Sequence, residues 1–260
     1  PDDIDELRDV IAACKAAGVP HFVLGCGSDL LVADEGYRGV IVSCTKGLVN
    51  VAIDGETMAC QAGVPLREAS EMACELGLSG LEFACGIPGS VGGACFMNAG
   101  AYGGCVADVL ESVRCLMPDG TQQSLPVGEL AMGYRASRVR DEGLVVLSAT
   151  FRLHEDDQDD IRARMDDFTQ RRKKRQPLEL PSAGSTFKRP EGHFAGKLIT
   201  DAGLKGYAHG GASVSTKHAG FVVNNGGATA ADVQSVIEHV QDEVERQFGV
   251  RLEPELRFLG

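Results

Sequence analysis

The sequence predicts an α+β fold in two parts, for three reasons. Helix and strand patterns mix along the 260 residues without the regular alternation of a doubly wound parallel sheet. Two hairpins are indicated in the first part, by the turn signals Asp54-Gly55 and "PDGT" between apolar runs. After residue 154 an acidic run passes into a basic one, which is the charge order that a helix dipole favours. We therefore predict two domains, 1–154 and 155–260.

The first domain begins with a helix, because apolar residues from Ile4 to Cys14 recur at helical spacing and Gly18 ends the pattern. The sequence then predicts, in order, strands at 21–24 and 39–44, a hairpin of 48–54 with 57–63, a helix at 65–77, a hairpin of 109–117 with 121–127, and a strand at 143–153. In the second domain it predicts helices at 154–177 and 233–248 and a final strand at 250–258. Hairpins packed against a few helices follow from this order.

Charge and cysteine usage exclude several classes of function. Lys and Arg number 25 against 37 Asp and Glu, a net charge of −12, so most of the surface repels nucleic-acid phosphates. All nine cysteines lie in the first 115 residues, none forms a C-x-x-C pair and the count is odd, which argues against a disulfide framework or a zinc site. No stretch has the length of a membrane span, and no signal peptide is visible. We expect reduced, mostly buried thiols in a cytoplasmic protein, with no metal, nucleic-acid or membrane partner.

One uncharged segment, 86–104, carries seven glycines among small residues. Such bare backbone lets successive N–H groups approach a pyrophosphate or a planar ring. A buried, close-packed loop would have the same composition, so both interpretations stay open. A shorter glycine pair in "LGCGSDLL", 24–31, follows a predicted strand and fits either a tight turn or a ligand loop. It lacks the dinucleotide fingerprint, because Leu30 stands at the third glycine position, and no P-loop motif occurs in the chain.

Both glycine clusters belong to a set of motifs that resembles one family. The motifs, in order, are "GCGSDLLV", "GIPGSVGGACFMNAGAYGG", "YRASR", "PSAGSTFKRP", "AGKLITDAGLKG", "KHAGFVVN" and "LEPELRF". Their order and spacing, over residues 21–259, are similar to those of the UDP-N-acetylenolpyruvoylglucosamine reductases of peptidoglycan synthesis, in the shorter subclass.

The resemblance implies a fold, a cofactor and a reaction. The fold is a two-part FAD-binding domain of the vanillyl-alcohol-oxidase (PCMH) type, with subdomains 1–45 and 46–154, followed by a smaller α+β substrate-binding lobe. FAD is held non-covalently and NADPH is the co-substrate. The small-molecule substrate is a UDP-sugar, whose enolpyruvyl ether is reduced to give UDP-N-acetylmuramate. We expect the enzyme to be a monomer.

On this resemblance the two glycine clusters hold the FAD phosphates and the flavin, since backbone donors suit an anionic diphosphate in an acidic protein. The implied cofactor-binding residues are Gly25, Cys26, Gly27, Ser28, Asp29, Leu30, Gly86, Ile87, Pro88, Gly89, Ser90, Gly92, Gly93, Asn98, Gly100, Tyr102 and Gly103.

The resemblance also implies catalytic roles for Arg135, Ser185 and Glu255. Arg135, in "GYRASR", matches the catalytic arginine, whose planar fork suits a carboxylate. Ser185, in "SAGSTF", matches the proton donor, and a serine must be activated by its surroundings to act as an acid. From the pattern alone, Arg135 could equally form a surface ion pair, and Ser185 could be a loop or cap hydroxyl.

Glu255, in "RLEPELRFLG", matches the catalytic glutamate of the family. If this stretch is a strand, Leu256 and Phe258 share one buried face, and Glu255 and Arg257 project together toward a cleft. Pro254 indicates an edge strand. An exposed ion pair is the alternative that the pattern allows.

The remaining implied residues contact the substrate. The only basic block of the acidic chain, 171–175, could equally be the C-terminal end of a helix that needs no ligand. The implied substrate-binding residues are Tyr134, Arg172, Arg189, Lys205, Lys217, His218, Asn224 and Arg257.

Three positions depart from the pattern of the family. Asp29 and Gly220 stand where Asn is usual, and Val139 stands where Phe is usual. Asp29 would place a negative charge near the FAD phosphates. The departures at Asp29 and Gly220 leave open a non-catalytic protein that binds flavin or nucleotide sugar. A FAD-dependent alcohol or sugar oxidase of the same fold is the other alternative.

Overall fold

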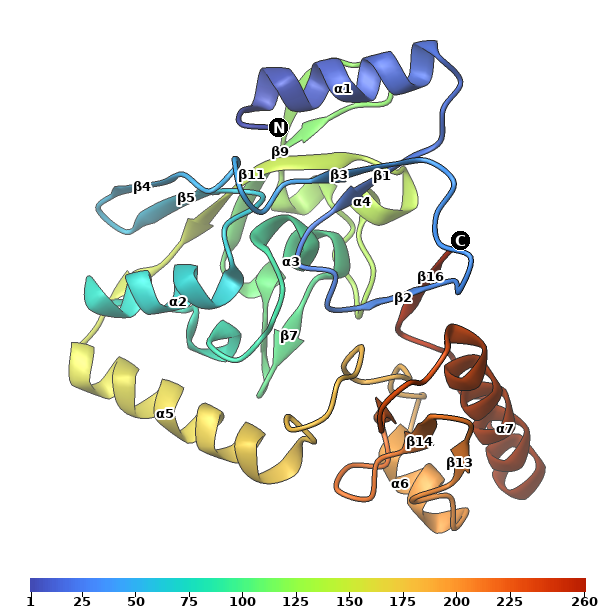
Figure 1. Ribbon diagram of the computed structural model, residues 1–260. Helices are drawn as coiled ribbons and strands as arrows, with labels where there is room; N and C mark the ends of the chain where they lie inside the picture. The colour runs from blue at the N-terminus through green and yellow to red at the C-terminus, as the bar shows by residue number, and fades with distance from the viewer. The chain divides into compact units, whose positions relative to one another are not determined.

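The computed structural model describes all of residues 1–260. The chain divides into two compact units (Figure 1): unit 1 comprises 1–27 and 39–170, and unit 2 comprises 28–38 and 171–260. These bounds differ from those of the predicted domains, because a helix that follows residue 154 packs on unit 1 and a short early strand pairs with the C-terminal strand in unit 2.

An antiparallel sheet of five strands is the centre of unit 1. Its strand order is β10-β9-β11-β5-β4, with β4 at Val51–Asp54, β5 at Thr57–Gln61, β9 at Leu110–Leu116, β10 at Gln122–Pro126 and β11 at Val145–Arg152. Both predicted hairpins are confirmed, since β4 pairs with β5 and β9 with β10. Along β9, Val113 and Cys115 are buried in the main core and Arg114 between them is exposed, which is the alternation of a strand with one face on the core. At the end of the strand, Leu116 is buried instead with Leu7 and Ile11 of α1.

Helices and short strands surround this sheet. The predicted first helix is α1 (Ile4–Ala16), which begins where Asp3 accepts a hydrogen bond from the Glu6 amide at 2.8 Å. The predicted strands β1 (His21–Leu24) and β3 (Val40–Ser43) pair in parallel. The other elements are α2 (Leu66–Glu75), β6 (Leu78–Ser79), η1 (Glu82–Ala84), α3 (Val91–Met97), β7 (Gly100–Ala101), β8 (Gly104–Cys105), η2 (Val106–Asp108), η3 (Val127–Glu129), α4 (Arg138–Asp141) and β12 (His154–Glu155).

The helix predicted from its charge order is α5 (Gln158–Arg175). Its acidic first turn and basic last turn complement the helix dipole. Ile161 and Met165 are buried against Cys74 and Cys85 of unit 1. Unit 1 therefore continues to residue 170, well into this helix.

Unit 2 is built around one three-stranded antiparallel sheet, of order β13-β14-β15. Its elements are β2 (Leu30–Val32), α6 (Ala195–Asp201), β13 (Ala208–His209), β14 (Ala212–Val214), β15 (Val222–Asn224), α7 (Ala230–Phe248) and β16 (Arg257–Leu259). The predicted helix α7 starts with a capping box of Thr229 and Asp232. Asp34 accepts hydrogen bonds from the Ala230 and Ala231 amides at 2.7 and 3.1 Å, which ties the segment 28–38 to this unit.

The predicted C-terminal strand is shorter than expected, and the burial predicted for it is wrong. Only Arg257–Leu259 forms a strand, paired in parallel with β2. Leu256 is buried, but Phe258 is 51% exposed, so the two do not share a buried face. The reason is that the stretch changes its pairing partner: Pro254 pairs with Phe187, whereas β16 pairs with β2. A single alternation of buried and exposed side chains therefore does not continue from Leu256 to Phe258.

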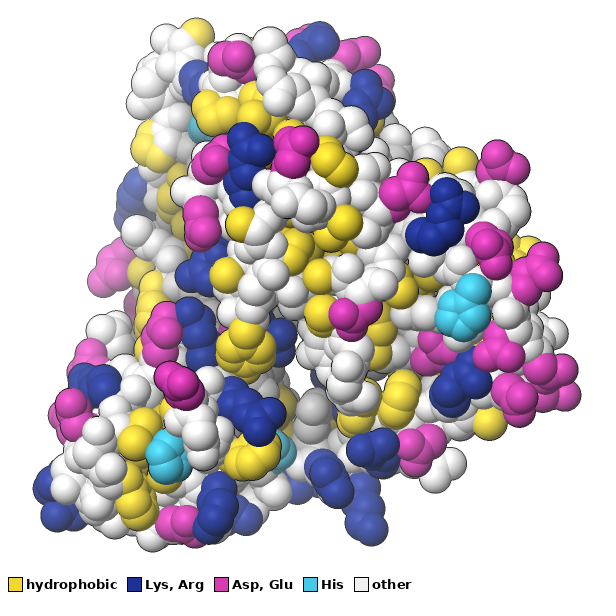
Figure 2. Space-filling view, turned by 180° about the vertical axis from the view of Figure 1, so that it is seen from behind, with side chains coloured by type: hydrophobic (Ala, Val, Ile, Leu, Met, Phe, Trp, Pro, Cys, Tyr) yellow, Lys and Arg dark blue, Asp and Glu magenta, His cyan; other side chains and the backbone are white.

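The surface mixes charged and apolar side chains, and Figure 2 shows acidic and basic groups interspersed over one face. Seven of the nine cysteines are buried free thiols, which confirms the predicted burial, while Cys26 is exposed. Burial raises the pKa of Cys60 to about 12 and that of Cys115 to about 11, so both stay protonated and pack as small apolar groups. None of the helices combines the length and apolar character that crossing a membrane requires.

Candidate active site

The two glycine clusters meet inside unit 1. A Cβ atom at Gly25 would overlap the Oγ of Ser90, so the loop at 25–27 packs directly on the glycine-rich segment. Ser90 also begins α3, where its Oγ accepts a hydrogen bond from the Gly93 amide at 3.3 Å. The structure therefore brings together two of the motifs that the sequence assigns to FAD.

The glycine-rich segment is more ordered than the expected loop, because it contains α3 and the β7–β8 pair. The amides of Val91 and Gly92 donate to the carbonyls of Val64 and Ala62, each at 2.8 Å. A Cβ atom at Gly92 would lie 2.9 Å from the Cβ of Ala62. Close packing therefore explains why glycine stands at position 92, as the interpretation of this segment as a buried, close-packed loop predicts.

Other backbone donors of the two clusters are free to hold an anion. The amides of Cys26, Gly27 and Gly89 donate to no acceptor within the protein. Adjacent backbone N–H groups on glycine-rich turns are well suited to phosphate oxygens. The residues present in unit 1 therefore fit the diphosphate of FAD.

Strained backbone gathers among the predicted residues of unit 1. Four residues other than glycine have left-handed φ angles, and three of them were predicted as site residues: Asn98 at 43°, Tyr102 at 55° and Arg135 at 55°. Such conformations cost about 1–3 kcal/mol each and persist where the surroundings enforce them, often at functional sites. The sequence pattern alone gave no sign of this strain.

Arg135 lies in a tight turn that is held by hydrogen bonds to its backbone, at the carbonyls of Gly133 and of Arg135 itself. Its carbonyl accepts a hydrogen bond from Arg140 Nη1 at 2.5 Å. Its guanidinium lies 4.9 Å from the centre of the Tyr134 ring. The buried Asn98 side chain donates to the carbonyl of Gly133 at 2.9 Å, which links this turn to the end of α3. The Arg135 turn is therefore anchored to the glycine-rich segment.

In unit 2 the structure brings Ser185 and Glu255 onto neighbouring segments. The Glu255 amide donates to the carbonyl of Thr186, the residue after Ser185, at 2.8 Å. Phe187 and Pro254 form an antiparallel bridge beside this bond. Thr186, which no sequence pattern singled out, is buried, and its Oγ1 accepts a hydrogen bond from the Val222 amide at 2.9 Å. These bonds fix the backbone of both catalytic candidates.

A tight turn in unit 2 carries Lys217 and His218. The Oγ of Ser215 accepts hydrogen bonds from both of their amides, at 3.2 and 3.3 Å. Burial lowers the pKa of His218, and nearby Lys205 and Arg175 lower it further, so the imidazole is neutral at neutral pH. A Cβ atom at Gly220 would lie 2.9 Å from the Cε1 of His218. A side chain at position 220 would therefore require the imidazole to shift.

The other predicted substrate residues are spread over unit 2. Arg257 lies on β16, where its amide donates to the carbonyl of Asp29 at 3.0 Å. The guanidinium of Arg189 lies 4.0 Å from the centre of the Phe194 ring. The Oδ1 of Asn224 accepts from the Gly226 and Ala228 amides, so this side chain shapes a turn. The predicted cofactor loop 25–30 is divided, since Gly25–Gly27 belong to unit 1 and Ser28–Leu30 to unit 2.

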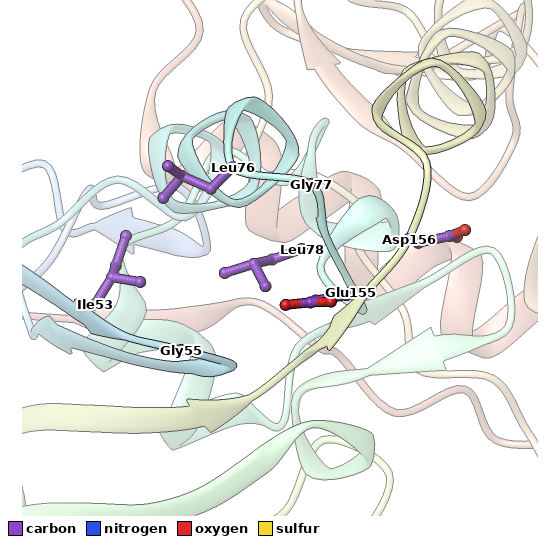
Figure 3. Close-up of a pocket in the computed structure, with 7 residues that line it drawn as sticks. All are labelled: Ile53, Gly55, Leu76, Gly77, Leu78, Glu155 and Asp156. Atoms are coloured by element: carbon purple, nitrogen blue, oxygen red, sulfur yellow. The ribbon is translucent and has the colours of Figure 1, made fainter.

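A surface groove in unit 1 lies apart from all of these residues. Ile53, Leu76 and Leu78 point toward it, while Asp156 points away (Figure 3). Asp156 is instead held by Arg164, at 2.6 Å. None of the predicted site residues lines this groove.

Two family models match the chain. The model described as FAD binding domain covers residues 1–126, and the C-terminal domain of UDP-N-acetylenolpyruvoylglucosamine reductase covers residues 176–259. Together with the glycine clusters of unit 1, these matches define an FAD-dependent oxidoreductase with the predicted α+β fold.

Curated relatives give the family. UDP-N-acetylenolpyruvoylglucosamine reductase of Clostridium beijerinckii is 52% identical over 260 residues, which are 100% of this chain and 85% of the relative. The enzyme of the same name from Syntrophomonas wolfei is 48% identical, over 100% of this chain and 87% of the relative. A crystal structure of the reductase from Thermus caldophilus matches 98% of this chain and 89% of its own, at a TM-score of 0.83 and 36% identity. The chain belongs to the UDP-N-acetylenolpyruvoylglucosamine reductase family.

Proposed function

We propose that this enzyme reduces UDP-N-acetylenolpyruvoylglucosamine to UDP-N-acetylmuramate, with NADPH as the electron donor, in peptidoglycan precursor synthesis. The observation that carries the proposal is the 52% identity over all 260 residues to a reductase of that name. The proposal assigns cofactor binding mainly to residues 1–154 and substrate binding mainly to residues 155–260, although the compact units divide the chain at other residues.

FAD, when bound, supplies the transfer of a hydride from NADPH to the enolpyruvyl group. The backbone of Gly25–Gly27 and Gly89 would hold its diphosphate, because these amides face no protein acceptor on packed, glycine-lined turns. Ser28, Asp29 and Leu30 would continue this loop, and Tyr102 and Gly103 would lie at the flavin.

Arg135 would bind the carboxylate of the enolpyruvyl group. Hydride addition to the terminal carbon of the double bond leaves negative charge on the adjacent carbon, which is delocalised into this carboxylate. A guanidinium offers two parallel donors to a carboxylate and stays charged throughout. The enforced turn around Arg135 supports this role, since a fixed cation needs no reorganisation as the charge develops.

Ser185 would then deliver a proton from its Oγ to the carbon that carries the negative charge. A hydroxyl is a weak acid, but the carbanion that forms on the substrate is a strong base and can take its proton. The alkoxide left on Oγ would then regain a proton from solvent. Glu255 would orient the substrate and the hydroxyl from the adjoining segment. The hydrogen bond between the Glu255 amide and Thr186 supports this pairing of roles.

We propose as further substrate-binding residues Tyr134, Arg172, Arg189, Lys205, Lys217, His218, Asn224 and Arg257. We propose that the enzyme acts as a monomer in the cytoplasm. Seven buried free thiols support a reducing compartment.

The test is the product itself. The purified protein is incubated with NADPH and the enolpyruvyl substrate, and the products are identified by mass spectrometry. We expect substrate-dependent NADPH oxidation and a product that carries two more hydrogens than the substrate. NADPH oxidation that proceeds equally without the substrate, with consumption of dioxygen and no such product, would contradict the proposal.

A further inference from the structure

Helix α5 holds the start of the glycine-rich segment. Its residues Ile161 and Met165 are buried in one cluster with Cys74 and Cys85. Cys85 directly precedes the first glycine of the segment, Gly86, and its Sγ lies 3.6 Å from the carbonyl oxygen of Met165. The helix thus fixes the point at which the segment begins.

An ion pair between Arg164 and Glu82 joins α5 to η1, which packs near the end of the glycine-rich segment. The Arg164 guanidinium donates to the carboxylate of the buried Glu82 at 2.8 Å, and Ser79 donates to the same carboxylate at 2.7 Å. The next residue, Phe83, packs on the hairpin of β7 and β8, because a Cβ atom at Gly104 would lie 3.0 Å from its ring. The hairpin and α5 are therefore joined through η1.

A stacked aromatic pair makes the direct link. The rings of Phe168, on α5, and Tyr102, in the hairpin turn, lie 4.7 Å apart with an angle of 4° between their planes. Tyr102 and Gly103 have φ angles of 55° and 92°, so the turn has two left-handed residues in succession. This is the conformation of a tight hairpin turn, in which glycine or asparagine is usual and tyrosine is not.

We propose that Phe168 is a positioning residue for the FAD site, which acts by holding the Tyr102 ring over α5 and so keeping the turn in its left-handed form. The inference rests on the proposed function, since Tyr102 and Gly103 belong to the same FAD site. A side chain that prefers negative φ relaxes unless its surroundings hold it, and the stack with Phe168 is a contact that does so. The remaining contacts of α5 hold the helix in place without that ring.

The experiment measures the release of FAD from holoenzyme variants, followed as the rise of flavin fluorescence after dilution. Phe168→Leu removes the ring and keeps apolar volume, and we expect it to release FAD about tenfold faster. Phe168→Tyr keeps the ring and should behave like the parent. Ile161→Val, on the same helix but away from the turn, is the matched control, which should lower the thermal midpoint without changing FAD release.

A double substitution shows whether Phe168 acts through Tyr102. Tyr102→Gly relieves the strain and removes the partner ring, so Phe168→Leu should have no further effect on FAD release in that background. The inference is overturned if Phe168→Leu releases FAD at the parent rate, or if its effect is as large with Tyr102→Gly as without it. A parent protein that binds no FAD would overturn the proposed function as well, so the two failures are distinguishable.

Discussion

The two units position their functional groups by opposite means. In unit 1 the backbone itself is shaped, with Asn98, Tyr102 and Arg135 in left-handed conformations. In unit 2, Ser185 and Glu255 lie on short segments joined by backbone pairing, and no residue other than glycine has a left-handed φ. Strain survives only where many contacts enforce it. Unit 1 should therefore tolerate little change around its site, whereas side chains in unit 2 should be replaceable with loss of chemistry alone.

The largest effect expected from this comparison is that of Ser185→Ala. It should slow oxidation of the reduced flavin by the substrate by about 10²–10⁴-fold, the usual contribution of a positioned acid. Flavin reduction by NADPH should keep the parent rate, and stopped-flow absorbance measures both steps. Ser124→Ala removes an exposed hydroxyl on β10 of unit 1 and should leave both steps unchanged. Equal losses in the two half-reactions would show that Ser185 is not the specific proton donor.

Arg135→Ala tests the shaped backbone of unit 1. Turnover should fall by about 10²–10³-fold, the scale of one lost charge-stabilising group. Arg135→Lys should not restore it, because an ammonium lacks the planar fork. Arg138→Ala, three residues on, removes an ion pair with Glu142 and is the control. Turnover and bound flavin are measured together, and Arg135→Ala protein that purifies without FAD would contradict the assigned role.

Glu82→Gln tests how firmly unit 1 is held. The substitution should lower the free energy of unfolding by about 2 kcal/mol. This is less than the loss of a fully buried ion pair would cost, because the Arg164 side chain is 40% exposed and still has its ion pair with Asp156. Burial raises the pKa of Glu82, but hydrogen bonds from Ser79 and Arg164 outweigh it and hold the pKa below the ordinary 4.5.

The sign of the pH dependence follows from that lowered pKa. The folded state binds the Glu82 proton more weakly than the unfolded state, so the stabilisation is complete above pH 4.5 and is lost as the pH falls through the folded value. Urea unfolding of parent and Glu82→Gln should therefore converge in acid. Glu111→Gln removes an exposed pair with Arg152 and should cost under about 1 kcal/mol. A gap between parent and Glu82→Gln that stays constant down to pH 3 would contradict this account.

Gly25→Ala should have the smallest effect. The added methyl group meets Ser90 Oγ and pushes the two glycine clusters apart, so FAD affinity should fall about tenfold. Gly128→Ala, with no atom within 4 Å of the added carbon, is the matched control. Titration of FAD into the flavin-depleted variants measures their affinities. Equal FAD affinities for Gly25→Ala and Gly128→Ala would show that Gly25 does not contribute to the cofactor site.

The same contrast explains what the sequence could predict. Regular elements such as α1, α7 and both hairpins were predictable, because their apolar residues repeat with a clear period. Helix α3 was not, since Gly92 and Gly93 lower helix propensity, and contacts with the distant Ala62 and Val64 help to hold it in place. The bridge between Phe187 and Pro254 joins residues far apart in the sequence, so no local pattern could reveal it.

An anaerobic titration tests the central claim most directly. The purified protein is reduced with one equivalent of NADPH, the enolpyruvyl substrate is added, and the visible absorbance of the flavin is followed. We predict rapid return of the oxidised spectrum with one UDP-N-acetylmuramate formed per flavin. A flavin that stays reduced in the presence of the substrate would contradict the assignment, and the acceptor would have to be sought elsewhere.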